Sequence, residues 1–147
     1  MRTRLVFVAV LAALLLSACG RTTTPHVRFE PKGTSLTTLE AETLAATTDI
    51  TSITNVGASE APALRTVMLG ELRGKGPAGA HAAQLLTTGF PTSTASVPVL
   101  VRICSFEDTS AVVVVEAFGD PGGKLTHRRL WVFASASDSV IRAASFR

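Results

Sequence analysis

The most reactive side chains in this 147-residue sequence are two thiols, Cys19 and Cys104. A cysteine acts as a nucleophile through its thiolate, so its surroundings decide whether it reacts. Cys19 directly follows Ser17 and Ala18, whose small side chains let a peptidase approach the backbone closely. Cys104 lies in an apolar, β-branched run, where we expect a buried small hydrophobe. The sequence therefore favours modification at Cys19 and packing at Cys104.

The segment before Cys19 has the layout of an export signal. Arg2 and Arg4 form a short positive region, and residues 5–16 are an uncharged apolar run. As a helix this run would measure about 18 Å, short of the roughly 30 Å of a hydrocarbon core. A cleavable leader is therefore favoured over a retained membrane-spanning helix.

The four residues Leu16-Ser17-Ala18-Cys19 resemble the lipobox of bacterial lipoproteins. The resemblance implies that the Cys19 thiol takes a diacylglyceryl group and that signal peptidase II, recognising Leu16, Ser17 and Ala18, cuts before Cys19. Residues 1–18 would then be a lipoprotein signal peptide. Acyl chains such as palmitate would hold Cys19 on the extracytoplasmic face of the cell membrane, or on the outer membrane of a cell that has one. An ordinary secretory signal with an incidental cysteine is the alternative.

A second group of chemically capable residues is the basic cluster of Lys124, His127, Arg128 and Arg129. Its residue types suit lipid headgroups, the phosphates of a wall polymer or the acidic patch of a partner. The alternative is a solvated strand end whose charges discourage edge-to-edge pairing. Consecutive arginines on a strand point to opposite faces, which weakens a joint grip on one anion.

No catalytic, metal or cofactor site emerges from the remaining motifs. The stretch 119–126, "GDPGGKLT", has too few residues between its glycines for a phosphate-binding loop, and Leu125 replaces the required Ser or Thr. The spacing of the histidines lacks a metal-ligand pattern, and nothing requires Cys104 and His127 to form a nucleophile pair. The histidines are His26, His81 and His127.

Charge argues against nucleic-acid binding. The full sequence has a formal net charge of +3, and removing Arg2 and Arg4 with the leader leaves 12 basic residues against 11 acidic ones. A chain close to neutral has no basic stripe for a phosphate backbone.

The predicted organisation has three parts: the signal peptide (1–18), a lipidated, threonine-rich tether (19–56) and a small domain (57–147). Pro25 and Pro31 disfavour early helix, so residues 20–33 are expected to be a solvated linker. The rest of the tether is ambiguous, because Ser35 is suited to cap a helix whereas the β-branched residues that follow favour extended chain.

The predicted domain is α+β, with one or two helices packed on a four-stranded antiparallel meander. Helical spacing of apolar residues predicts the helices, and short β-branched runs joined by turn residues predict the strands. The element order is loosely similar to cystatin-like and NTF2-like cone folds. The helices are 60–72 and 78–86, and the strands are 97–106, 111–118, 127–135 and 140–146.

Both faces of the predicted sheet are apolar, so both need a cover. The helices can cover one; the 36–56 segment, a second subunit or a ligand could cover the other, which leaves the oligomeric state open. We expect a membrane-anchored, non-enzymatic binding domain whose partner is an envelope protein or ligand. The alternative is a small envelope enzyme or pseudo-enzyme with a pocket between sheet and helices, joining His127 with Glu116 or Cys104.

Overall fold

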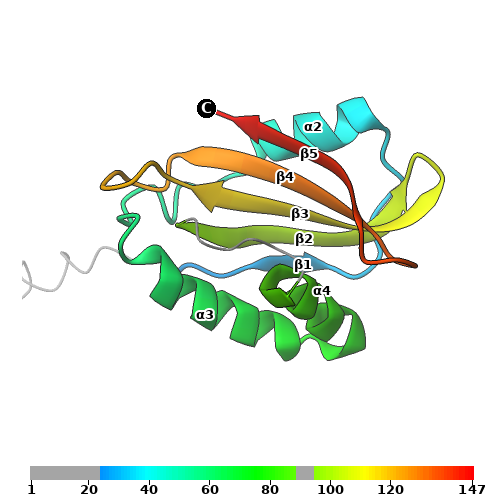
Figure 1. The fold of residues 1–147 in the computed structure, drawn as a ribbon, viewed down its shortest axis with the longest axis horizontal. Helices are drawn as coiled ribbons and strands as arrows, with labels where there is room; N and C mark the ends of the chain where they lie inside the picture. Colours follow the sequence, from blue (N-terminus) through cyan, green and yellow to red (C-terminus); the bar gives the residue numbers. More distant parts are fainter. Residues whose placement is uncertain (1–23, 89–94) are drawn as a thin grey trace, which may run out of the picture.

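The computed structural model describes residues 24–88 and 95–147, so the predicted signal peptide and lipobox lie outside the described residues. The described chain is α+β, with three helices and a five-stranded mixed sheet (Figure 1). In chain order the elements are β1 (Arg28–Glu30), α2 (Thr38–Thr47), α3 (Ala61–Arg73), α4 (Gly76–Thr88), β2 (Ser96–Phe106), β3 (Thr109–Phe118), β4 (His127–Ala134) and β5 (Val140–Phe146).

The sheet has the strand order β1-β2-β3-β4-β5. Strands β2 to β5 form an antiparallel meander close to the predicted ranges, as their short connections require. The prediction of four strands was wrong by one, because β1 adds to the β2 edge in parallel, with Phe29 opposite Val101. A strand of three residues close to two prolines carries only a brief alternation pattern, which is easily overlooked.

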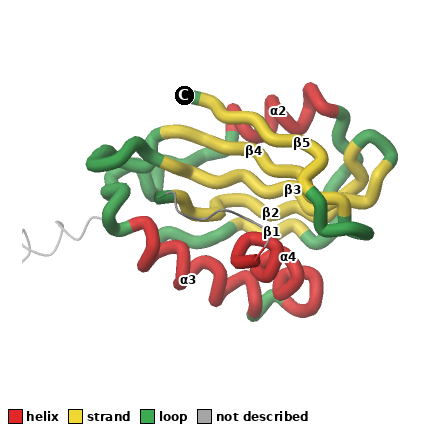
Figure 2. The backbone as a smooth tube through the Cα atoms, viewed as in Figure 1, coloured by secondary structure: helices red, strands yellow, loops and turns green. Residues whose placement is uncertain are grey.

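The two faces of the sheet are covered by different helices. Arg65 of α3 bonds Glu116 of β3 on one face. Arg128 of β4 points to the opposite face, because its neighbour Arg129 is the residue opposite Glu116, and it donates to the Thr48 carbonyl just after α2. Figure 2 shows α2 across the sheet from α3 and α4. Of the three possible covers named for the second face of the sheet, the 36–56 segment is the one present in the structure.

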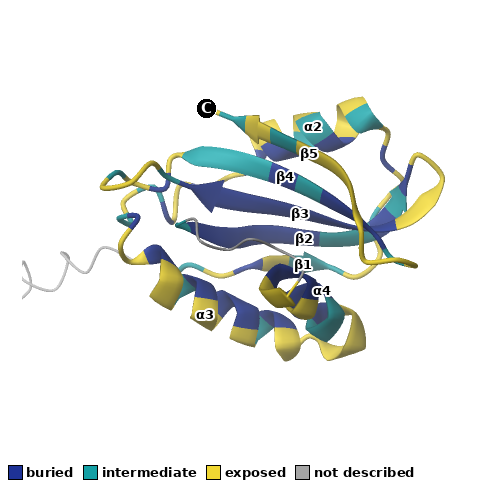
Figure 3. Ribbon diagram, viewed as in Figure 1, coloured by how far each residue is buried: buried dark blue, intermediate teal, exposed yellow. Residues whose placement is uncertain are grey.

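The segment predicted as a tether belongs to the domain from Val27 onward. Val27 is 3% exposed, Ile53 is fully buried, and both belong to the same core as the meander (Figure 3). The predicted boundary at residue 57 was therefore wrong. The core positions of α2 are alanines, Ala41 and Ala45, and small residues among threonines give a weak apolar signal.

Helix α2 begins with a capping box at Thr37, two residues after the predicted cap at Ser35. The Glu40 N–H donates to the Thr37 hydroxyl at 3.3 Å, and the Thr37 N–H donates to the Glu40 carboxylate at 2.8 Å. These hydrogen bonds from Thr37 lower the pKa of Glu40. The reciprocal pair satisfies two backbone donors at the start of a short helix.

Helices α3 and α4 match their predicted positions within a few residues. The "RGKGP" stretch ends α3 as expected, and α4 begins at Gly76, whose φ of 85° suits glycine. A side chain at Gly79 would clash with the Leu72 carbonyl, so glycine there permits the close approach of the two helices.

A buried ion pair joins this helical layer to the sheet. Arg65 Nη1 lies 2.5 Å from Glu116 Oε1, with Arg65 8% exposed and Glu116 fully buried. The guanidinium also donates to the carbonyls of Ser96, at 3.1 Å, and Leu86, at 2.9 Å. The Trp131 indole donates to the second Glu116 oxygen at 3.2 Å. Each buried charge thus has several partners, which offset the cost of leaving water.

Removing one member of this pair should destabilise the fold strongly. Glu116→Ala leaves the Arg65 guanidinium buried without its counter-charge, and we expect it to lower the free energy of unfolding by about 3–5 kcal/mol. Urea unfolding followed by circular dichroism measures the change. The control is Glu42→Ala, whose ion pair with Arg142 lies at the surface with both side chains partly exposed and should contribute less than about 1 kcal/mol. Equal losses in the two variants would contradict this role.

The inclusion of the 27–56 segment in the core gives a second prediction. Ile53→Ala opens a cavity at a fully buried position, so we expect a loss of about 2–5 kcal/mol in urea unfolding. Leu39→Ala, at a residue 73% exposed, should change stability by less than about 0.5 kcal/mol. A tether would instead tolerate both changes alike.

Candidate functional site

The predicted basic cluster is divided between the two faces of the sheet. Arg128 Nε donates to the Thr48 carbonyl at 2.8 Å on the α2 face. Arg129 lies on the opposite face, with its guanidinium carbon 4.3 Å from the centre of the Phe118 ring. Lys124 is exposed in the loop before β4. The four side chains are not brought to one place as a shared anion site would require.

His127, the fourth member of the cluster, has local partners. Its Nε2 lies 3.6 Å from an Asp120 carboxylate oxygen, and its ring centre is 5.3 Å from that of Phe118. Arg129 stacks on the same phenylalanine, so aromatic and acidic neighbours already engage this end of β4.

The combinations expected of an envelope enzyme are not assembled. Cys104 is opposite Ala111 near one end of β3, whereas His127 is opposite Phe118 at the other end. Glu116 bonds Arg65 and Trp131 rather than His127. Neither pairing expected for His127 is therefore present.

Cys104 itself is a buried free cysteine. Burial raises the pKa of its thiol, and the nearby positive charge of Arg102 opposes that rise by less. The thiol is therefore protonated at neutral pH, which suits the packing role predicted from its sequence neighbours.

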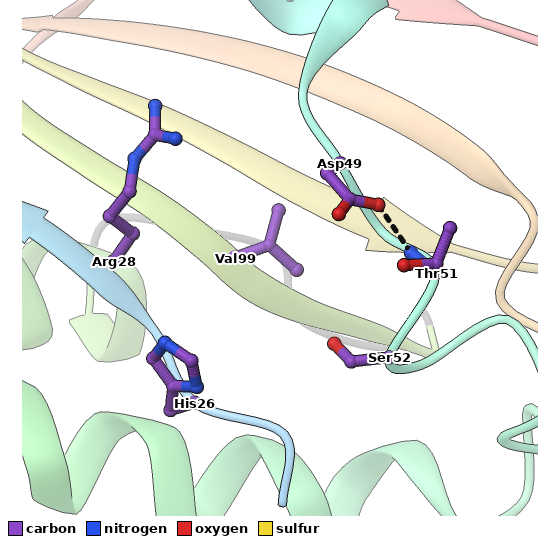
Figure 4. A pocket seen from close by; sticks show the side chains of 6 residues that line it. All are labelled: His26, Arg28, Asp49, Thr51, Ser52 and Val99. Carbon is purple, nitrogen blue, oxygen red and sulfur yellow. Dashed lines mark hydrogen bonds between the residues drawn. The ribbon is translucent and has the colours of Figure 1, made fainter. Parts of the chain in front are cut away.

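A concavity among the described residues lies between β1 and the loop after α2. Its volume is about 360 Å³, and Figure 4 shows the side chains that line it. His26 and Arg28 come from the β1 side, and Val99 of β2 lies between the two sides. The opposite side is a loop of polar residues, which are Asp49, Thr51 and Ser52.

The β1 wall of this pocket is organised by a row of charges. Arg28 Nε lies 2.9 Å from one oxygen of Glu30, and Arg102 Nε lies 2.5 Å from the other. Two guanidinium groups sharing one carboxylate leave a net positive charge. The Arg28 side chain is 55% exposed, so it remains accessible from the pocket.

The loop wall is held by an Asx-type turn. The Thr51 N–H donates to Asp49 Oδ1 at 2.9 Å. Hydrogen bonds from Thr51 are the main cause that lowers the pKa of Asp49, and the charge of Arg128 lowers it slightly further. Asp49 is thus an ionised carboxylate at neutral pH, on the opposite side of the pocket from Arg28.

The pocket residues were missed by the sequence reasoning because the tether was extended to residue 56. One signal was present in "HVRFE", residues 26–30, where Val27 and Phe29 alternate with His26, Arg28 and Glu30. Alternation with a period of two is the pattern of a half-buried strand. The sequence around Asp49 has no similar pattern that would predict its place in a pocket.

Residues 24–88 and 95–147 contain neither a metal-ligand cluster nor a membrane-spanning helix. No three His, Cys, Asp or Glu side chains gather there as a metal ion would require. Within the same ranges, no helix has the length and apolar character needed to cross a membrane.

Comparisons with known proteins assign no relative: no family model matches the chain, and neither a curated protein nor a solved structure is similar to it. The function is therefore argued from the residues themselves.

The raised pKa of Cys104 predicts slow alkylation. At pH 8 we expect iodoacetamide to modify Cys104 at least tenfold more slowly in the folded protein than in urea, because burial both shields the sulfur and keeps it protonated. Peptide mass spectrometry of timed samples measures the rate. Similar rates in the two conditions would mean that the thiol is exposed.

Proposed function

We propose that this chain is a lipid-anchored protein on the extracytoplasmic face of a bacterial membrane and that its α+β domain is a non-enzymatic binding module. The observation that carries the proposal is the apolar run 5–16 ending in Leu16-Ser17-Ala18-Cys19, directly ahead of the domain. A diacylglyceryl thioether on Cys19 would supply the anchor, since two or more acyl chains hold a protein stably on a bilayer.

The fold supports this proposal through the short spacing between anchor and domain. Val27, the first core residue among those that the structure describes, is eight positions after Cys19, so even a fully extended chain would span only about 28 Å. A domain on so short a connection stays next to the bilayer surface. It is suited to ligands of the membrane or of the layer just outside it.

A binding role is supported by the pocket between β1 and the 49–52 loop. Its 360 Å³ volume lies within the roughly 300–1,000 Å³ range of small-molecule sites. Its polar side chains surround one apolar residue, Val99, and the recorded hydrogen bond of the His26 ring goes to the Thr24 carbonyl rather than to a hydroxyl of the pocket. The alternative of an envelope enzyme gains no support from this set of residues, and the likeness to cone folds stays a prediction.

Anchoring is tested by comparing the two cysteines. In a bacterial host that processes lipoproteins, the unmodified sequence should fractionate with membranes and carry a diacylglyceryl group on an N-terminal Cys19, detected by mass spectrometry. Cys19→Ala should lose the modification. Cys104→Ala is the matched control and should keep both the lipid and the membrane association. A wild-type protein without lipid on Cys19 would contradict the proposal.

A further inference from the structure

We propose that the pocket between β1 and the 49–52 loop binds a small zwitterion in which a phosphate group lies next to a primary ammonium, the chemistry of an aminoalkyl phosphate. The inference rests on the proposed function, because it assigns a ligand class to the pocket of the anchored binding domain.

The β1 wall offers the anion-binding groups. Glu30 engages the Nε of Arg28, and Arg28 is 55% exposed, so the outer nitrogens of its guanidinium can still donate to a phosphate oxygen. Arg102 shares Glu30 and keeps the row positive overall. His26 lies on the same wall as Arg28, and its ring supplies a further nitrogen for hydrogen bonding to the ligand.

The loop wall offers the ammonium-binding group. One oxygen of Asp49 accepts the Thr51 N–H, whereas Figure 4 shows its other oxygen turned towards the middle of the pocket. A carboxylate in this position accepts hydrogen bonds from a primary ammonium. The Ser52 hydroxyl lies on the same side and can act as donor or acceptor.

The opposition of the two walls selects for a ligand that carries both charges. A lone anion bound by Arg28 would meet the negative Asp49 across the pocket, and a lone cation bound by Asp49 would meet Arg28. A ligand with the two charges a few bonds apart satisfies both walls at once. Val99, between them, packs against the short alkyl link that joins the charged groups.

The position of the pocket in the chain brings this chemistry close to the membrane. His26 is seven positions after Cys19, which limits its distance from the lipid-bearing residue to about 25 Å. The headgroup of phosphatidylethanolamine presents a phosphate and a primary ammonium at such a surface. A free aminoalkyl phosphate presents the same groups, so the experiment includes both sources.

The first test uses the full lipidated chain in nonionic detergent micelles, with amide chemical shifts measured by NMR. Phosphoethanolamine should shift the amides of Arg28 and Thr51 in a saturable way. Inorganic phosphate alone and ethanolamine alone should each bind at least tenfold more weakly. Equal affinity for phosphate and phosphoethanolamine, or shifts confined to other residues, would overturn the proposal.

Two substitutions test the walls separately. Arg28→Gln and Asp49→Asn should each weaken phosphoethanolamine binding at least tenfold, with the remaining spectrum unchanged as evidence of an intact fold. Arg73→Gln removes an exposed charge from α3 that does not line the pocket and should leave the affinity unchanged, as should Asp108→Asn in the β2–β3 turn. Unchanged affinity in either wall variant would overturn the proposal.

Lipid nanodiscs distinguish the two sources of the ligand. Shifts at Arg28 and Thr51 with phosphatidylethanolamine, and none with phosphatidylcholine, whose quaternary ammonium has no N–H to donate, would assign the lipid headgroup. Shifts with soluble phosphoethanolamine alone would assign a free ligand. If neither phosphatidylethanolamine nor phosphoethanolamine shifts these amides, the zwitterion site is overturned. The anchoring proposal is unaffected, because the mass of the Cys19 peptide tests anchoring independently.

Discussion

The structure depends on one constraint: both faces of the central sheet are apolar and must be shielded from water. In β3, Val112 and Val114 point to one face and Val113 and Val115 to the other, and none is more than 1% exposed. Helices α3 and α4 cover the first face, so the chain ahead of them has to cover the second. Helix α2 contacts β4 and β5, and the loop after it continues over the sheet, with the Thr48 carbonyl bonded to Arg128 of β4 and Ile53 in the core. The pocket lies where this second cover ends, beside β1.

Sequence reasoning succeeded where the local signal was strong. The sequence predicts an antiparallel meander from the valine-rich runs of β2 and β3 and the turn residues between them. It also separates α3 from α4 at "RGKGP". It failed for β1 and α2. The alternation around β1 is brief and lies close to two prolines, and the core face of α2 is made of alanines among threonines, a composition that also suits a linker.

The functional residues were harder to predict because their roles depend on tertiary neighbours. Arg128 and Arg129 are adjacent in sequence, yet strand geometry sends one to Thr48 and the other to Phe118. The partner of Glu116 lies 51 residues away in α3, a separation that carries no sequence signal. The pocket similarly combines β1, β2 and a loop, and its charge pattern exists only once the sheet has formed.

The central claim is that the chain enters the sheet almost immediately after the position proposed for the anchor, so that an anchor there would hold the pocket close to a membrane. Amide hydrogen exchange on the full chain tests this claim directly. The account predicts that the amides of β1 and α2 are protected together with those of β2, as one cooperative unit. Unprotected amides throughout residues 24–56, with protection beginning only in α3, would contradict this claim and would show that the segment is a long tether.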